Sequence, residues 1–160
     1  MEIITLLDTS IYLNILNVPG CNQDRMAILK QLSAQTPGEN RLLPMATIWE
    51  TGNHIADLRD GGSRYLLATQ FVKDILRAFQ GETPYMPTYL PDKSEFISWL
   101  KDYPEHAKRS KKITKPSEGV SLADFSMIKE WERTRARNPR RRVRIWSLDQ
   151  DLAGYDTHPT

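Results

Sequence analysis

A short apolar segment at the start of the chain constrains the fold more than any other feature of the sequence. Four of the six residues 2–7 are apolar, and the polar residues Asp8, Thr9 and Ser10 follow directly. Such a run, ending at residues that favour helix N-caps, predicts a buried strand and then a helix capped by Thr9 or Ser10. Asp8 is therefore expected at the carboxyl end of a buried strand, where open α/β sheets form their binding crevices.

Strand and helix patterns alternate along the rest of the chain. Further strands are expected near residues 42–45 and 143–147, and further helices near residues 22–34, 47–60, 64–80, 94–103 and 121–137. Parallel strands need long crossover connections, so these helical stretches predict an α/β fold with a mostly parallel sheet.

Three segments between the second and last strands carry more specific expectations. Residues 83–93 contain three prolines and predict an irregular or edge segment, and the next helix should end before Pro104. Residues 108–118 are basic with few apolar residues, which favours a loop. The helix at 64–80 is expected to bury one face, because its apolar residues follow helical spacing at Ala68, Phe71, Val72, Ile75, Leu76 and Phe79.

Length and composition indicate a single domain formed by residues 1–160. No window approaches the roughly 18 apolar residues of a membrane helix, and the first residues lack the basic region of a secretory signal. The only cysteine, Cys21, excludes an internal disulfide and favours a reducing compartment. We therefore expect a cytoplasmic protein that does not contact a membrane.

Positive charge is concentrated in one part of the chain. Residues 108–144 hold 13 Lys and Arg against 4 Asp and Glu, whereas residues 1–107 hold 9 against 13. A basic segment of this kind fits a polyanionic partner, because neutralised phosphates release counterions. A solvated face or a basic loop would give the same pattern.

Four acidic residues fall where a parallel α/β sheet would bring them together. Asp8 and Asp149 follow the first and last predicted strands. Glu50 lies early in the helix after the second strand, and Asp124 lies in the first turn of the helix that begins at Ser121. Strand ends and helix starts share the carboxyl edge of the sheet, so all four could meet in one crevice. Each also has a structural explanation as a helix cap, a first-turn acid or a turn residue.

Convergent carboxylates suit hard divalent cations. Mg²⁺ and Mn²⁺ prefer oxygen ligands and are often held by a few carboxylates together with a substrate phosphate. Two such ions about 4 Å apart can activate water and stabilise the leaving oxygen of a phosphodiester. The acids therefore predict a site that cleaves phosphodiester bonds, flanked by basic segments that hold the nucleic-acid backbone.

The arrangement resembles the PIN domain, a family with many metal-dependent ribonucleases, including the toxins of toxin–antitoxin pairs. The motifs that carry the resemblance are Leu6–Ser10, Ala46–Glu50, Ser121–Asp124 and Ser147–Leu152. The resemblance implies a three-layer α/β/α fold and a site for Mg²⁺ or Mn²⁺. Its metal ligands would be Asp8, Glu50, Asp124 and Asp149, with Asp151 as an auxiliary ligand.

Two departures from the family pattern concern the middle and the end of the chain. The stretch from about 60 to 120 is longer than in compact members and forms an extended helical and basic-loop middle. The chain also ends soon after Asp151, which leaves little room for the family's usual last strand.

Further residues are candidates for contacts with the substrate. His54 shares a helix face with Glu50, and Arg64 stands at a helix start that could bind an anion. The basic segment before Ser121 is better placed than the one at 133–142, which starts at the far end of the Asp124 helix. The candidates are Ser10, His54, Arg64, Lys108, Arg109, Lys111, Lys112 and Lys115.

The sequence thus predicts a metal-dependent endonuclease that uses two metal ions and cuts RNA in preference to DNA. The resemblance adds a toxin-like role, with an antitoxin or other regulatory protein as partner, and leaves a homodimer open. Two other functions fit the same residues. One is a non-catalytic nucleic-acid-binding module, and the other is a protein-interaction domain whose acids act as helix caps.

Overall fold

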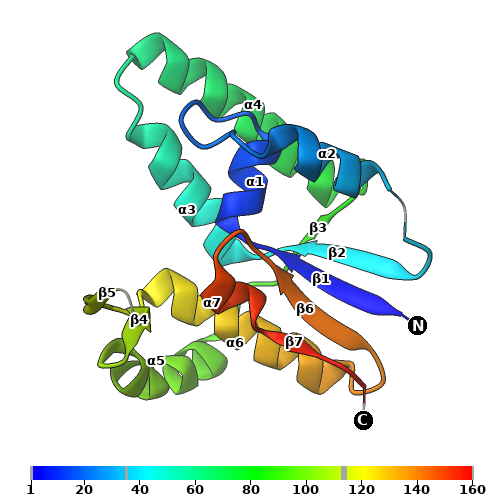
Figure 1. Ribbon diagram of the computed structural model, residues 1–160, viewed down its shortest axis with the longest axis vertical. Coiled ribbons are helices and arrows are strands. Elements are labelled where there is room, and N and C mark those ends of the chain that lie inside the picture. The colour runs from blue at the N-terminus through cyan, green and yellow to red at the C-terminus, as the bar shows by residue number, and fades with distance from the viewer. Residues whose placement is uncertain (1, 35, 113–114, 160) are drawn as a thin grey trace.

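The first strand of the chain is the central strand of the sheet (Figure 1). The computed structural model describes residues 2–34, 36–112 and 115–159, and within them the main sheet has the strand order β3-β2-β1-β6-β7. Neighbouring strands run parallel except for β6 and β7, which are antiparallel. The strands are β1 Ile3–Leu7, β2 Glu39–Leu43, β3 Met86–Pro87, β6 Arg142–Trp146 and β7 Asp156–Thr157.

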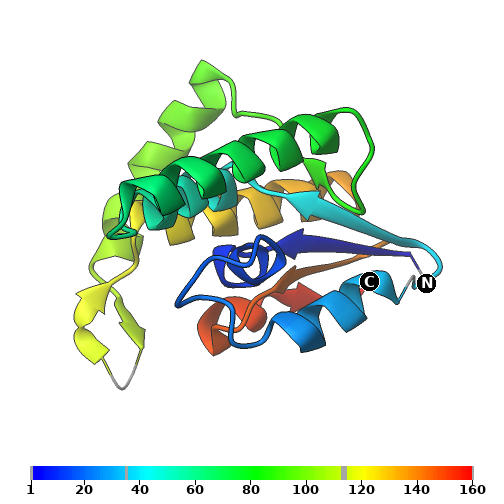
Figure 2. The ribbon, with the colours of Figure 1, turned by 90° about the horizontal axis from the view of Figure 1, so that it is seen from above.

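Helices cover both faces of this sheet, which confirms the α/β fold in three layers (Figures 1 and 2). On one side lie α1 Thr9–Ile15, α2 Arg25–Ser33, α3 Met45–Ala56 and α4 Gly61–Phe79. On the other side lie α5 Lys93–Ala107, α6 Leu122–Arg137 and α7 Gln150–Ala153. None of the helices in the described residues has the length and apolar run needed to cross a bilayer.

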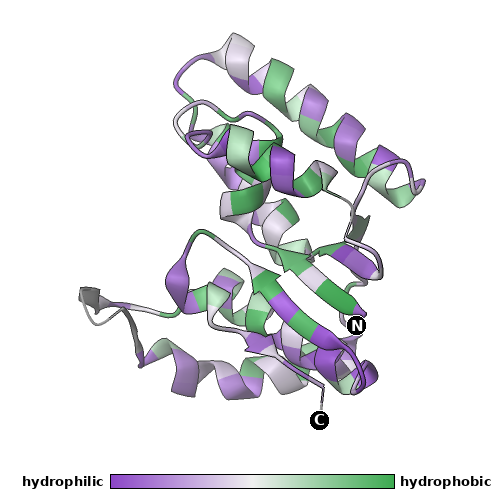
Figure 3. Cartoon of the chain, turned by 45° about the vertical axis from the view of Figure 1, so that its right-hand side comes forward, coloured by the Kyte–Doolittle hydropathy of each residue, from purple (hydrophilic) through white to green (hydrophobic). Residues whose placement is uncertain are grey.

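Strand β1 is buried on both faces, as its apolar sequence predicts (Figure 3). Leu6 faces the layer of α6 and packs in a cluster with Met127 and Ile145. Leu7 points to the opposite layer and packs in a second cluster with Tyr12 of α1. Successive side chains of β1 point to opposite faces of the sheet, so the strand contributes to both apolar clusters. This two-sided burial fixes the register of the strand and the position of Asp8.

The start of α1 differs from the sequence prediction. Asp8, not Thr9 or Ser10, is the N-cap, and its Oδ2 accepts a hydrogen bond from the backbone N–H of Ser10 at 3.4 Å. The prediction was wrong because Asp8 has an extended backbone directly before the helix, the conformation that an N-cap requires. The hydroxyl of Thr9 is committed elsewhere, to the carboxylate of Glu50.

The segment from α5 to α6 holds two further corrections. Helix α5 does not end before Pro104 but continues to Ala107. Leu100, whose carbonyl loses its N–H partner at Pro104, is exposed, so water can replace that bond. The predicted loop at 108–118 contains an antiparallel hairpin, β4 Ser110–Lys112 and β5 Lys115–Gly119, which projects from the body (Figure 2). A hairpin satisfies its own backbone hydrogen bonds, so it forms without the apolar pattern by which strands are predicted.

Helix α4 buries less of its apolar surface than its spacing predicts. It begins at Gly61, behind Asp60 as N-cap, whereas the preceding helix already ends at Ala56. Ala78 is buried and Phe71 is half-buried, but other apolar residues of the predicted buried face are exposed. These are Val72, Leu76 and Phe79, and Tyr65 and Leu66 are exposed as well. The sheet can cover only one side of this outer helix, so its second apolar side faces solvent.

Candidate metal-binding site at the carboxyl edge

Asp8 lies at the end of β1 with its carboxylate held in a fixed orientation. Its side chain is 6% exposed, and its Oδ2 accepts hydrogen bonds from the hydroxyls of Ser10 at 2.8 Å and Ser147 at 2.7 Å. No donor among the described residues reaches Oδ1 by a hydrogen bond. One carboxylate oxygen is therefore anchored by the protein, and the other remains available to a cation.

Ser147 joins the end of β6 to the same carboxylate. Its Oγ donates to Asp8 and accepts the backbone N–H of Asp149 at 2.9 Å. Asp149 is the N-cap of α7, where its Oδ1 accepts the N–H of the exposed Asp151 at 3.0 Å. A single hydroxyl thus connects the two strand ends that carry Asp8 and Asp149.

Glu50 points from α3 toward the end of β1. Its Oε2 accepts a hydrogen bond of 2.7 Å from the hydroxyl of Thr9. Burial is the largest influence on this carboxyl and raises its pKa, and the negative charges of Asp124 and Asp8 raise it further. The Thr9 hydroxyl and the nearby His54 act in the opposite direction, but the pKa of Glu50 remains above its usual value.

Asp124 reaches the same region from the first turn of α6. Its backbone N–H donates to the Oγ of Ser121 at 3.1 Å, so Ser121 is the N-cap, as its sequence position predicts. The Asp124 side chain is half-buried and contributes its charge to the field at Glu50. Three acids from three separate elements, Asp8, Glu50 and Asp124, are therefore electrostatic neighbours.

The residues at this edge fit a hard divalent cation in their chemistry. Within the described parts of the chain, no three His, Cys, Asp or Glu side chains are already close enough to bind a metal ion. The donors that converge are carboxylate oxygens, the ligands that Mg²⁺ and Mn²⁺ prefer. A cation would also relieve the repulsion that raises the pKa of Glu50.

Comparison with known proteins identifies the fold. No family model and no curated protein matches this sequence. The crystal structure of FitAcB from Neisseria gonorrhoeae is similar, with a TM-score of 0.55 and 18% identity over 94% of this chain and 91% of that one. A structure of FitAB bound to an IR36 DNA fragment has a TM-score of 0.54 and 20% identity over 94% and 89%. The chain has the PIN-domain fold.

Two hydroxyls at this edge orient acidic side chains, a role that was not predicted from the sequence. Thr9 orients Glu50, and Ser147 orients Asp8 and supports the backbone of Asp149. Both lie beside acids within the motifs that resemble the family. A signal was therefore present, namely Thr9 next to Asp8 and Ser147 two residues before Asp149, but the partner of each hydroxyl depends on contacts between distant segments.

The predicted substrate-contact residues occupy different surroundings. His54 is exposed near Glu50, whereas the hydroxyl of Ser10 is engaged with Asp8 and with the N–H of Leu148 at 3.0 Å. Arg64 donates to the carbonyl oxygens of Leu58 and Arg59 at 2.5 and 3.2 Å and so stabilises the connection between α3 and α4.

Two of the basic candidates, Lys108 and Arg109, follow the end of α5. Both are exposed, and Lys108 forms an ion pair of 2.6 Å with Glu105. The side chains of Lys111, Lys112 and Lys115 lie outside the described part of the structure.

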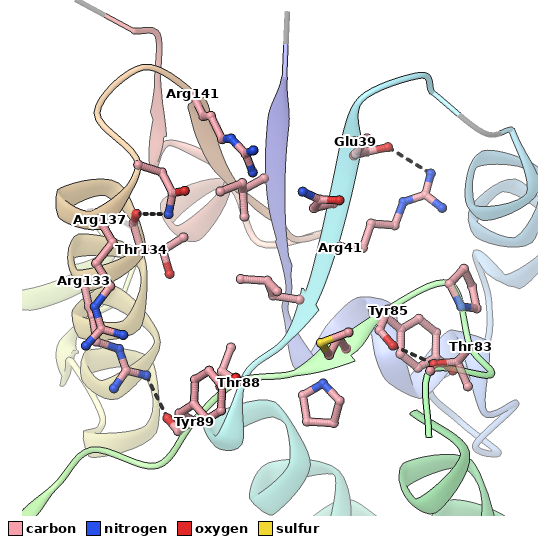
Figure 4. Close-up of a pocket in the computed structure, with 18 residues that line it drawn as sticks. Glu39, Arg41, Thr83, Tyr85, Thr88, Tyr89, Arg133, Thr134, Arg137 and Arg141 are labelled. Carbon is pink, nitrogen blue, oxygen red and sulfur yellow. Dashed lines mark hydrogen bonds and ion pairs between the residues drawn. The ribbon is translucent and has the colours of Figure 1, made fainter. Parts of the chain in front are cut away.

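The second basic segment lies beside the PIN-like sheet. There a cavity of about 600 Å³ opens between α6 and the edge formed by β2 and β3 (Figure 4). Arg133, Arg137 and Arg141 line it, and Arg133 donates to the carbonyl oxygen of Tyr89 at 2.8 Å. The cavity runs along the sheet, since Arg141 pairs with Glu2 at the amino end, whereas Arg133 contacts Tyr89, which follows the carboxyl end of β3.

Proposed function

We propose that this PIN-like protein is a Mg²⁺- or Mn²⁺-dependent endonuclease that hydrolyses RNA. The observation that supports the proposal is that Glu50 accepts a hydrogen bond from Thr9, next to Asp8, and that the charges of Asp124 and Asp8 raise the pKa of Glu50. Helix capping explains the place of Asp8, but it does not explain why Glu50 points toward it from another element.

The acids would have distinct roles in such a site. The metal ions would be held by Asp8, Glu50, Asp124 and Asp149, with Asp151 as an auxiliary ligand. Bound cations of this kind neutralise the carboxylates, activate water and stabilise the leaving oxygen of a phosphodiester. The protein's own contribution is orientation, because Ser147 and Ser10 hold one oxygen of Asp8 while Thr9 holds one oxygen of Glu50.

Basic residues around the edge would bind the phosphate backbone. His54 is the best placed, because its charge already influences Glu50. Lys108 and Arg109 lie at the base of the hairpin, and the remaining proposed contacts are Ser10, Arg64, Lys111, Lys112 and Lys115. Positive side chains near a metal site attract a polyanion and hold it in register.

We also propose a regulatory protein partner of the antitoxin kind. One similar structure, FitAB, is bound to a DNA fragment. In the present chain, the exposed apolar residues of α4, which include Val72, Leu76 and Phe79, offer a surface for such a partner or for a second copy of the chain.

Cleavage assays test the enzymatic part of the proposal. The purified protein should cut single-stranded RNA with Mg²⁺ or Mn²⁺, and excess EDTA should stop the reaction. Asp8→Asn and Asp124→Asn should abolish cleavage with little change in the circular dichroism spectrum. Asp60→Asn is a matched control, because Asp60 also caps a helix but lies outside the acid group. Full activity of Asp8→Asn, or undiminished cleavage in EDTA, would refute the proposal.

A second candidate function is a protein-interaction domain without catalysis. The observation that favours it is that Asp8 and Asp149 are both genuine N-caps, with side chains that accept backbone N–H groups. In that case Asp8→Asn would change stability alone, and the protein would bind no polynucleotide at low salt.

A further inference from the structure

An apolar groove opens beside the acids of the carboxyl edge. It encloses about 220 Å³ between α3, α5 and α6. Trp49, Phe96, Leu100 and Leu122 line it and are all exposed, with 60% of the Trp49 side chain accessible to solvent. Exposed apolar side chains that gather around a concavity indicate a binding site rather than ordinary surface.

The groove is continuous with the proposed active site, on which this inference rests. Glu50 belongs to both, since it lines the groove and is one of the proposed metal ligands. Leu122 and Ala123, which line the opposite side, directly precede Asp124 on α6. A group seated in the groove would therefore contact one proposed metal ligand, Glu50, and the residue that precedes another, Asp124.

The size and chemistry of the groove select a planar, largely uncharged group. Its volume is below the roughly 300 Å³ at which pockets for drug-sized ligands begin. Trp49 offers an indole face, and Asn53, one turn further along α3, brings an amide that can both donate and accept hydrogen bonds. An aromatic face combined with an amide is the combination that recognises a nucleobase by stacking and by its polar edge.

We propose that this groove binds one unpaired nucleobase next to the scissile phosphate, with Trp49 as the stacking surface. A base in a duplex is stacked and paired and cannot enter a pocket of this kind without leaving the helix. Trp49 is then a positioning residue, because stacking of the base fixes the phosphate over the carboxylates.

Substitution of Trp49 combined with an altered substrate tests this inference. Trp49→Ala should weaken binding and lower kcat/KM by roughly 5- to 150-fold, the equivalent of one base–aromatic stack of about 1–3 kcal/mol. Trp49→Phe should restore most of the loss. For the wild type, an RNA with an abasic residue next to the cleaved bond should be a poorer substrate than the normal RNA. For Trp49→Ala, the abasic RNA and the normal RNA should be cleaved equally well.

The matched control is Tyr65→Ala, which removes an aromatic side chain of similar exposure from α4, far along the chain from the acids. It should cut both substrates like the wild type. The inference would be overturned if the abasic RNA lowered kcat/KM by the same factor for the wild type and for Trp49→Ala. It would also be overturned if the wild type cut duplex RNA as fast as single-stranded RNA.

Binding measurements separate failure of the inference from failure of the proposed nuclease activity. A fluorescent five-nucleotide RNA is titrated into Asp8→Asn, with and without Trp49→Ala. If the wild type never cleaves but this RNA binds only when Trp49 is present, the nuclease proposal fails and the base-binding groove stands. If cleavage requires Asp8 but neither binding nor rate responds to Trp49→Ala, the groove proposal fails alone.

Discussion

Replacing Glu130 with glutamine should change how the stability of the fold depends on pH. Glu130 lies on α6 with 1% of its side chain exposed. Its Oε1 accepts hydrogen bonds from the hydroxyl of Thr88 at 2.6 Å and from Arg133 at 3.3 Å. Burial is the dominant influence and raises the pKa of Glu130 to about 7, although both of these contacts favour the charged form.

The magnitude follows from proton linkage. An unperturbed glutamate has a pKa of 4.5, so the folded state binds this proton more tightly than the unfolded chain does. Stability therefore falls as pH rises from about 4.5 to about 7 and stays constant above that range. A pKa difference of this size corresponds to about 3 kcal/mol of the free energy of unfolding. Glutamine does not ionise, so Glu130→Gln should lack this loss.

Urea unfolding followed by tryptophan fluorescence measures the effect. The wild type and Glu130→Gln are compared at about pH 5 and at about pH 8, and Glu105→Gln serves as the exposed control. Relative to the wild type, Glu130→Gln should gain about 3 kcal/mol between the two pH values, whereas Glu105→Gln should gain nothing comparable. A constant difference between the wild type and Glu130→Gln at both pH values would refute the reasoning.

Two other buried polar groups give predictions for the same assay. Glu39→Gln should cost about 3–5 kcal/mol, because Arg41 and Arg144 would lose the carboxylate that they contact at 3.0 Å. Burial raises the pKa of Glu39, but hydrogen bonds from Thr5 and Arg144 lower it more, so the pKa in the folded state lies below the usual value. The stabilisation by Glu39 should therefore be lost only as the pH falls through the pKa that Glu39 has in the folded state. If the stabilisation by Glu39 persisted below that pH, this reasoning would be contradicted. Tyr12→Phe should cost about 1 kcal/mol by removing the hydrogen bond of 2.7 Å to Asp74. Tyr12→Phe combined with Tyr85→Phe should cost more than the two single changes together, since Asp74 would lose both donors, and strict additivity would argue against a shared network.

Local sequence patterns were sufficient for the elements that build the carboxyl edge. The apolar run before Asp8 predicted β1, and Ser121 predicted the start of α6 to the residue. Parallel topology then followed from the helical lengths between the strands. That the charges of Asp8 and Asp124 act on Glu50 agrees with helix starts and strand ends sharing one edge of such a sheet, although among the described residues no three acids are close enough to bind a metal ion.

Features that depend on contacts between distant segments were not predictable. The burial of α4 was overestimated, because spacing shows which face is apolar but not whether anything covers it. The hairpin at 110–119 lacks an apolar pattern, so only its backbone pairing reveals it. Likewise, no local pattern places the hydroxyl of Ser147 on Asp8 or the carboxyl of Glu130 beside Thr88.

The central position of the first strand has a consequence for synthesis on the ribosome. Ser147 and Asp8 are 139 residues apart, and β1 cannot pair with β6 until β6 itself has emerged from the ribosome. Contacts of such long sequence separation form late and slowly. Asp8 is translated long before Ser147, so its surroundings are assembled only after β6 and the residue that follows it have been made. A nascent or truncated chain that lacks β6 would therefore lack both a neighbour of β1 and the hydroxyl of Ser147 that orients Asp8.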